Sequence, residues 1–242
     1  MVSIMIDVST AEFIVNSISF LCAYIFVVTV TGAFRAWVAV RMGDVSIEHA
    51  GFVTLNPFMH VQPIGVLFLL LQSFGVGSFI SVNPDYIQGR YRWLKIVCAF
   101  YSDTVLNGLS AIAGMFVLIV SFDVNIIRIV ELIIRNRDAS HMYMAHLYPT
   151  YSSSAIVAGY IVAAAVSLHI GLMVVEFLFN SCILIFSFLI RPSFFNTYDM
   201  ALYELIAWVV LVLFFFQPLL RLVAAIITHI GYTLAYALHF IH

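Results

Sequence analysis

Residues 34–65 read FRAWVAVRMGDVSIEHAGFVTLNPFMHVQPIG and separate two apolar runs. The run before it, Phe13–Phe34, has the ~20 residues that a helix needs to cross a ~30 Å hydrocarbon core. Within the stretch, Asn56-Pro57 and Gln62-Pro63 mark two turns on either side of His60. Polar clusters next to membrane spans are energetically unfavourable and often mark functional sites. This stretch is therefore the first candidate for a functional site.

The composition of the whole chain indicates a polytopic membrane protein. Of its 242 residues, 64% are hydrophobic and 9% are charged, whereas soluble domains are about 45–50% apolar and about 25% charged. So few charges cannot cover a water-facing surface, which excludes soluble enzymes, nucleic-acid-binding proteins and disordered tails. The net charge of −2 gives no electrostatic case for nucleic acid or for anionic lipid surfaces. Three widely spaced cysteines without a CxxC pair argue against a thiolate metal site.

Five apolar runs are candidates for membrane segments. Phe13–Phe34 follows the capping-box pattern Ser9–Glu12, which predicts a helix start there. Ile64–Val82 is short and interrupted by glycines, so it is either a thin span or a re-entrant element. The third run, Leu94–Ser121, is a span that carries polar residues. The fourth run, Ala155–Ile190, is too long for an ordinary span. It is either one tilted helix or two elements broken near Gly171 or Asn180. The fifth run is Ala201–Ile227.

The segments between and after these runs complete the prediction. Residues 122–153 form an extramembrane loop, in which Ile126–Ile134 has an apolar face at helical spacing. That face predicts either an amphipathic helix lying in the membrane interface or a packed extramembrane helix. The tail Ile230–Ile241 is too short to cross and is expected in the interface. The chain is therefore predicted to be an all-α integral membrane protein, a single domain over 1–242 with four to six transmembrane or re-entrant segments and C-terminal spans at 155–228.

The arginines and the lysine do not fix the membrane orientation. If the spans alternate, Arg35 and Arg41 lie on the side of the 122–153 loop, and the basic patch 90–95 lies on the other side with Arg191. The positive-inside rule then favours the first side as cytoplasmic.

The stretch 34–65 resembles a segment of the bacterial branch of the site-2 protease family, which are intramembrane zinc metalloproteases. That family typically reads AWVA-x-x-x-GD, then a short polar connection, then AGRLTLNPLAHIDPIG. The positions that match in register are Ala36–Ala39, Gly43-Asp44, Ala50-Gly51, Thr54–Pro57, His60 and Pro63–Gly65. A second family element, FGWAKPVPVNP, is similar to Phe74–Pro84, and a GPxxN helix is approximated by Asp103–Asn107. The resemblance implies a site-2-protease-like core over 13–107 and a bacterial inner membrane.

The residues that carry the family's catalysis are replaced in this chain. The family has H-E-x-x-H directly before AWVA, where two histidines bind Zn²⁺ and the glutamate is the general base. The corresponding positions here are Thr31, Gly32 and Arg35. An arginine cannot ligate zinc because it stays protonated and offers no lone pair. The family's third ligand is an aspartate, and Asn180 is the best counterpart here, although a neutral amide is a poor zinc ligand.

The resemblance and the missing ligands together predict a catalytically inactive member that binds or scaffolds a transmembrane partner. No cofactor is expected, and the partners are the lipid bilayer and a transmembrane helix of another protein, with the oligomeric state left open. The candidate residues for a partner groove are Asn56, His60, Gln62, Asn83 and Asn107.

Two alternatives stay open. The first is an active zinc metallopeptidase with rearranged ligands, for which His49 and His60 are the first candidates, followed by His141, His146 and Asp103. The second is a transport or structural subunit in which Asp103, Glu176 and His169 line a polar path. His169 and Glu176 are seven residues apart and share a helix face, so a direct pair between them is expected. Arg35 is expected either to pair with Asp44, Asp103 or Asn180, or to extend to the membrane interface.

Overall fold

The computed structural model describes residues 2–72, 75–136, 141–189, 222, 225–226, 229–233 and 236–237. In these ranges the secondary structure is helical and has no strand beyond the single bridge between Val61 and Gly77. Three helices are long and apolar enough to cross a membrane: Glu12–Met42, Arg92–Ser121 and Ser153–Leu184. The predicted all-α membrane class is thus confirmed. Most of the predicted span Ala201–Ile227 lies outside the described residues.

The first helix, α1 (Val2–Met42), is longer than the sequence predicted. It begins before the capping-box pattern Ser9–Glu12, so the prediction that this pattern starts the helix is wrong. Its end is set by Gly43, whose φ of 124° lies in a region that favours glycine. The Gly43 amide donates to the carbonyls of Ala39 (3.2 Å) and Val40 (3.0 Å), which satisfies the last turn.

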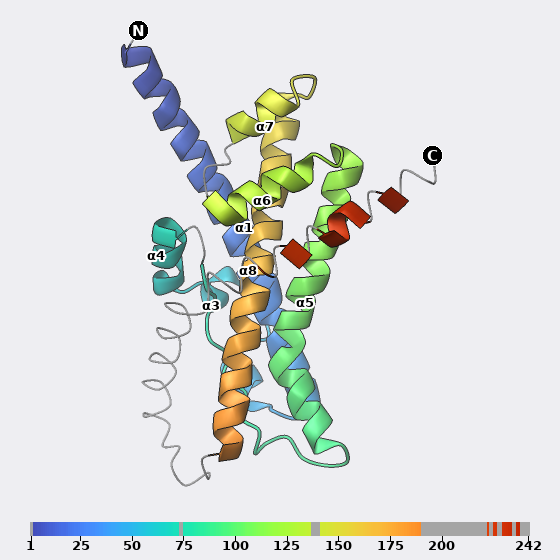
Figure 1. Ribbon diagram of the computed structural model, residues 1–242. Coiled ribbons are helices and arrows are strands. Elements are labelled where there is room, and N and C mark those ends of the chain that lie inside the picture. Colours follow the sequence, from blue (N-terminus) through green and yellow to red (C-terminus); the bar gives the residue numbers. More distant parts are fainter. Residues whose placement is uncertain are drawn as a thin grey trace.

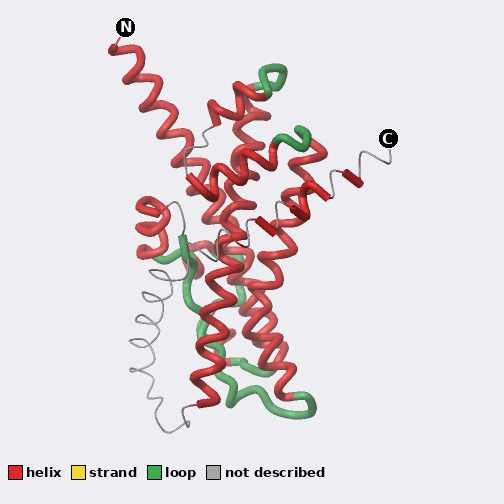
Figure 2. The backbone as a smooth tube through the Cα atoms, in the orientation of Figure 1, coloured by secondary structure: helices red, strands yellow, loops and turns green. Residues whose placement is uncertain are grey.

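Helix α8 (Ser153–Leu189) is the central helix of the bundle. It is one continuous helix without a break near Gly171 or Asn180, so the single-helix alternative is the correct one. In its most apolar window 61% of residues are buried, compared with 33% for α1 and 28% for α5 (Arg92–Ser121). α1 and α8 run in the same direction and α5 runs against them (Figure 1). The tube in Figure 2 shows the three long helices side by side.

The segment 44–83 leaves α1 and returns to the same end of the bundle. It contains α2 (Ser46–His49), α3 (Pro57–His60) and α4 (Pro63–Gln72). At ~1.5 Å per residue, the 10 residues of α4 extend ~15 Å, which is too short to cross. The chain then comes back as an extended segment in which the Ser78 amide donates to the His60 carbonyl (2.6 Å). Ile64–Val82 therefore does not form one spanning helix, and we call the folded-back segment 44–83 the re-entrant segment.

Tyr24 of α1 holds this re-entrant segment against the bundle. Its side chain is fully buried and its hydroxyl donates to the Val76 carbonyl (2.8 Å). Gly65 and Gly75 make room for the ring, since a Cβ at Gly75 would stand 2.5 Å from Tyr24 Cε2. These glycines therefore serve close packing on α1.

The re-entrant path changes the distribution of charges predicted from alternating spans. Arg41, Arg90, Arg92 and Lys95 lie at one end of the bundle, because the segment between them does not cross. α6 (Ile126–Asn136) and α7 (His141–Leu147) lie at the opposite end (Figure 1). The predicted separation of Arg41 from the 90–95 patch is wrong.

Helix α6 packs its apolar face against the bundle. Its apolar face belongs to the same core cluster as the first half of α8. The buried residues of this face are Ile126, Ile127, Ile129, Val130 and Ile133. The loop before α6 is fixed by Tyr148, whose hydroxyl donates to Asp123 (2.7 Å). Burial, followed by this contact with Asp123, raises the pKa of the Tyr148 hydroxyl, which keeps it protonated as the donor.

We predict that Gly65→Ala lowers the free energy of unfolding by about 1–3 kcal/mol, the usual result of overpacking. The new Cβ would stand 1.9 Å from the Val76 carbonyl oxygen and 2.5 Å from the Tyr24 hydroxyl. Thermal unfolding in detergent measures the effect. The matched control is Gly108→Ala, where the nearest atom is the flexible Met173 Sδ at 3.0 Å. Equal losses in the two variants would contradict the docking role of Gly65.

Candidate functional site

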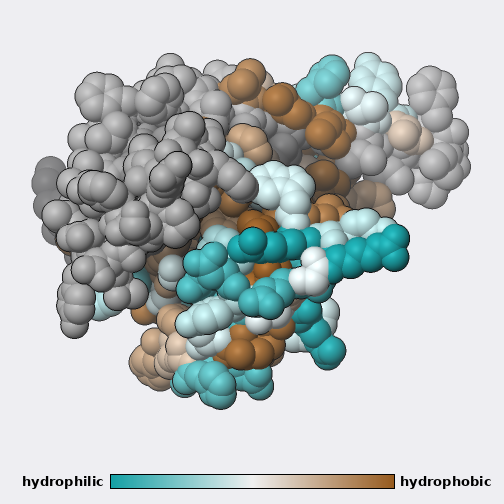
Figure 3. All heavy atoms as spheres, turned by 90° about the horizontal axis from the view of Figure 1, so that it is seen from below, coloured by the Kyte–Doolittle hydropathy of each residue, from teal (hydrophilic) through white to brown (hydrophobic). Residues whose placement is uncertain are grey.

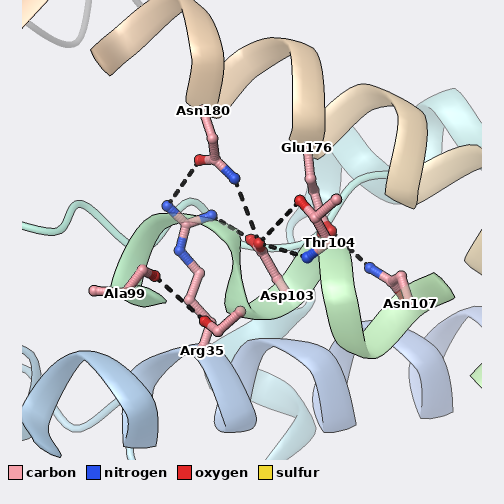
Figure 4. A network of polar contacts seen from close by, with 8 residues as sticks. Arg35, Ala99, Asp103, Thr104, Asn107, Glu176 and Asn180 are labelled. Carbon is pink, nitrogen blue, oxygen red and sulfur yellow. Dashed lines mark hydrogen bonds and ion pairs between the residues drawn. The ribbon is translucent and has the colours of Figure 1, made fainter. Parts of the chain in front are cut away.

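Three helices bring a buried polar cluster together. Arg35 of α1 forms an ion pair with Asp103 of α5 and donates to Asn180 Oδ1 of α8 (3.1 Å). Asn180 Nδ2 in turn donates to Asp103 Oδ1 (3.3 Å). The exposed fractions are 5% for Arg35, 2% for Asp103 and 0% for Asn180. Figure 4 shows the guanidinium enclosed between the carboxylate and the amide. This Arg35 cluster, consisting of Arg35, Asp103 and Asn180, contains the one buried ion pair among the described residues.

The carboxylate of Asp103 is well supplied with donors. Besides Arg35 and Asn180, the backbone amide of Thr104 donates to Oδ1 (2.7 Å). A buried ion pair is stable only when such additional hydrogen bonds satisfy its remaining lone pairs. Asp103 meets that condition. Of the three partners expected for Arg35, the structure selects Asp103 and Asn180, and the expectation of Asp44 is wrong.

Aromatic rings close the cluster on the side of the re-entrant segment. The Arg35 guanidinium carbon lies 5.7 Å from the centroid of the Phe79 ring, a cation–π distance. Phe79 packs edge-on against Phe179, the residue before Asn180, with centroids 4.8 Å apart. Arg35 Nε is buried and has no hydrogen-bond partner in the described residues. The re-entrant segment therefore contributes directly to the surroundings of Arg35.

Gly32 lies one turn before Arg35 and packs against the His60 ring. A Cβ placed on Gly32 would stand 2.4 Å from His60 Nδ1. The imidazole thus fills the volume that any side chain at position 32 would need. His60 Nε2 bonds to the Thr54 carbonyl (2.7 Å), while Nδ1 is buried without a partner in the described residues. Thr31 bonds back to the Val27 carbonyl of its own helix (2.8 Å).

A second polar cluster joins α5 to α8 closer to the middle of the bundle. Asn107 Oδ1 accepts from His169 Nδ1 (2.6 Å), and Asn107 Nδ2 donates to Glu176 Oε2 (2.6 Å). Because the amide oxygen is the acceptor, Nδ1 of His169 carries the proton. The direct pair expected between His169 and Glu176 is wrong, since Asn107 lies between them. Together, these three residues form the Asn107 cluster.

The remaining groove candidates have local structural roles. Asn56 caps α3 by accepting from the Phe58 amide (3.2 Å), and Asn83 accepts from the Asp85 amide (2.9 Å). The backbone carbonyl of Gln62 accepts from the Val66 amide (3.0 Å). Across the described residues, no hydrogen bond joins Asn56, Gln62 or Asn83 to the Arg35 cluster.

The candidate zinc ligands do not form a cluster in the described residues. There, no three side chains of His, Cys, Asp or Glu converge in an arrangement that could hold a metal ion. His49 is exposed, and His60 is buried against Gly32.

Asp44 is a structural residue that reasoning from the sequence missed. Its carboxylate is fully buried and accepts from the Ser46 amide (3.2 Å) and the Asn83 amide (2.7 Å). It thereby ties the end of α1 to the end of the re-entrant segment. The available signal was its position directly after Gly43, where a short polar side chain commonly bonds backbone amides.

We predict that Arg35→Met lowers the free energy of unfolding by about 3–5 kcal/mol, because it leaves the Asp103 carboxylate buried without a counter-charge. Arg35→Met combined with Asp103→Leu should lose much less than the sum of the single variants. A double-mutant cycle by thermal unfolding measures this coupling. Asp85→Asn is the exposed control, since Asp85 lies 3.4 Å from Arg92 at the surface and should matter by less than ~1 kcal/mol. Additive losses at Arg35 and Asp103 would refute the pairing.

For the second cluster, we expect Asn107→Leu to cost about 1–2 kcal/mol of stability, since it removes both interhelical hydrogen bonds. His169→Phe removes only one of them and should cost less. The same unfolding assay compares the two variants. A larger loss for His169→Phe would show that Asn107 is not the centre of this cluster.

Comparison with known proteins gives one partial similarity. The chain is 32% identical over 85 residues to the Bacillus subtilis (strain 168) protein named "Putative zinc metalloprotease YwhC". The similar region covers 35% of this chain and 38% of that protein. No protein-family model matches the chain, and no solved structure matches it. The similarity supports a site-2-protease-like relationship over about a third of the chain.

Proposed function

We propose that this protein is a catalytically inactive, site-2-protease-like membrane protein that binds a transmembrane helix of another protein without cleaving it. The observation that carries the proposal is the Arg35 cluster. In the alignment with the family motif, Arg35 and Asn180 stand at two of the three zinc-ligand positions. These two residues, 145 positions apart in the chain, share a 3.1 Å hydrogen bond.

The electrostatics of the cluster oppose a bound metal ion. A guanidinium is permanently charged and has only donors, so it offers Zn²⁺ no lone pair. Its charge would also repel the ion, while the nearest carboxylate, Asp103, already accepts from Arg35, Asn180 and the Thr104 amide. The Asn180 amide uses both its oxygen and its nitrogen within the cluster. We therefore propose that this protein holds no zinc at this position.

The second support is the contact between Gly32 and His60. Gly32 aligns with the family's general-base glutamate, and it has no side chain to activate a water molecule. Because His60 Nδ1 would lie 2.4 Å from a Cβ at this position, a glutamate could not be restored without displacing the imidazole. The base and the space for it are both absent.

The proposed partner surface is the outer face of the re-entrant segment. Its apolar side chains Leu55, Phe58 and Leu67 are 69%, 90% and 53% exposed. The segment packs on α1 at Tyr24 and Gly32, well inside the span Glu12–Met42. Irregular backbone at this depth has to be covered by protein or water rather than by lipid tails. A transmembrane helix from a partner in a bacterial inner membrane meets that need.

The experiment combines metal analysis with site-specific photo-crosslinking. We expect the purified protein to contain far less than one equivalent of zinc and to leave a transmembrane substrate intact. A photoreactive amino acid at Phe58 should give a discrete adduct with another membrane protein in native membranes. The same probe at Phe116 of α5, which is 43% exposed, serves as the control and should react with lipid alone.

Three results would contradict the proposal. Stoichiometric zinc together with cleavage would favour an active peptidase with rearranged ligands. An adduct between two copies of the chain would show self-association in place of a heterologous partner. Equal adducts from Phe58 and Phe116 would show that the re-entrant face has no selective role.

A further inference from the structure

One end of the bundle concentrates positive charge that the net charge of the chain conceals. Arg41 lies in the last turn of α1, and Arg90, Arg92 and Lys95 lie around the start of α5. The Gly43 region of α1 contacts the backbone of Tyr86 and Ile87, which places these cations at one end. Viewed from this end, hydrophilic side chains form a band across the described part of the surface, with apolar patches between them (Figure 3).

Two of the four cations stabilise the loop itself. Arg92 Nε donates to the Ile87 carbonyl (2.9 Å), and its Nη2 donates to the Pro84 carbonyl (3.1 Å). Lys95 Nζ donates to the Gln88 carbonyl (3.2 Å). These side chains fold the 84–91 loop back onto the first turn of α5. Arg92 and Lys95 are therefore structural cations.

Arg41 and Arg90 are arranged differently. The Arg41 guanidinium carbon lies 5.6 Å from the Trp37 ring centroid, and that of Arg90 lies 5.0 Å from the Tyr91 ring centroid. Both arginines are exposed, and neither forms a hydrogen bond or ion pair with the described residues. A guanidinium packed on an aromatic ring has its in-plane N–H groups free for a planar anion. The two arginines are thus oriented but uncommitted donors.

The surrounding aromatic residues suit the interface of a membrane. Trp37 is 48% exposed, Tyr91 65% and Trp93 55%, and such rings favour the headgroup level of a bilayer. Tyr91 has a φ of 63°, which is uncommon for a residue with a side chain. Tyr91 has this conformation directly before α5, and its exposed ring lies against the Arg90 guanidinium.

The opposite end lacks this arrangement in the described residues. Arg128 of α6 is exposed at the opposite end. Among the described residues of that end, no arginine packs on an aromatic ring as Arg41 and Arg90 do. Asp123 and Glu131 add negative charge at that end. At the cationic end, Asp85 is engaged with Arg92 at 3.4 Å and Asp44 is buried among donors, which leaves Glu48 as the opposing exposed acid.

We propose that Arg41 and Arg90, with Trp37 and Tyr91, form a binding surface for anionic phospholipid headgroups. The rings anchor this end at the headgroup level, and the free guanidinium edges bind phosphate oxygens by charge-assisted hydrogen bonds. The surface therefore selects the leaflet that is richer in anionic lipid. This binding is independent of whether the protein cleaves or binds a transmembrane partner.

The test is lipid titration of the delipidated, detergent-purified full chain, followed by native mass spectrometry. Phosphatidylglycerol should bind with higher affinity than phosphatidylcholine of the same chain length, and the preference should fall as salt is raised. Arg41→Gln and Arg90→Gln should each reduce phosphatidylglycerol affinity by about fivefold. Phosphatidylcholine affinity should be unchanged in both variants.

Arg128→Gln is the matched control at the other end and should keep the full preference. The free energy of unfolding of the variants should stay within about 1 kcal/mol of the wild type, because each arginine loses only an exposed cation–π contact. An unchanged preference in Arg41→Gln/Arg90→Gln would overturn the proposal, as would a loss of preference in Arg128→Gln. Competition by inorganic phosphate at equal concentration would also overturn it, since that would indicate a site for the free anion.

Discussion

The bundle depends on the pairing of Arg35 with Asp103. Neither charge is stable alone in a hydrocarbon environment, so each must meet the other wherever the helices pack. The pair fixes α1 against α5, and Asn180 adds α8 through bonds to both partners. Apolar packing between membrane helices is poorly directional, whereas these bonds set the depth of all three helices relative to one another.

The re-entrant segment follows from the same arrangement. α1 turns one face toward α5 and α8, and the neighbouring face carries Tyr24 and Gly32, where the segment docks. Close approach there requires residues without side chains on one side or the other, which is why glycines occupy positions 32, 65 and 75. Phe79 then links the two faces, because it belongs to the re-entrant segment and lies over Arg35.

Much of this fold could be predicted from local sequence, and the errors have physical causes. Run length indicated the three long helices, and the glycines in Ile64–Val82 allowed the re-entrant reading. The start of α1 was wrong because the capping pattern at Ser9–Glu12 is also compatible with a helix interior. The partner of Arg35 could not be chosen, since Asp44, Asp103 and Asn180 were equally plausible without knowledge of helix rotation. Asp44 was underestimated because its position after Gly43 indicates only a bond to a nearby amide, whereas the Asn83 amide that it also accepts from lies 39 positions away.

The charge balance of the Arg35 cluster bears on what the site can do. Arg35 and Asp103 together carry no net charge, so the cluster is stable without any further ion. Adding a divalent cation would leave two positive charges uncompensated beside a fixed guanidinium. Glu176 lies beside Asp103 in Figure 4, and its carboxyl group already accepts from Asn107 Nδ2. Under the proposed function, a metal ion at this position would require removal of Arg35, and that same change would leave Asp103 buried and unpaired. The residue proposed to oppose a metal ion is also the one that holds the helices together.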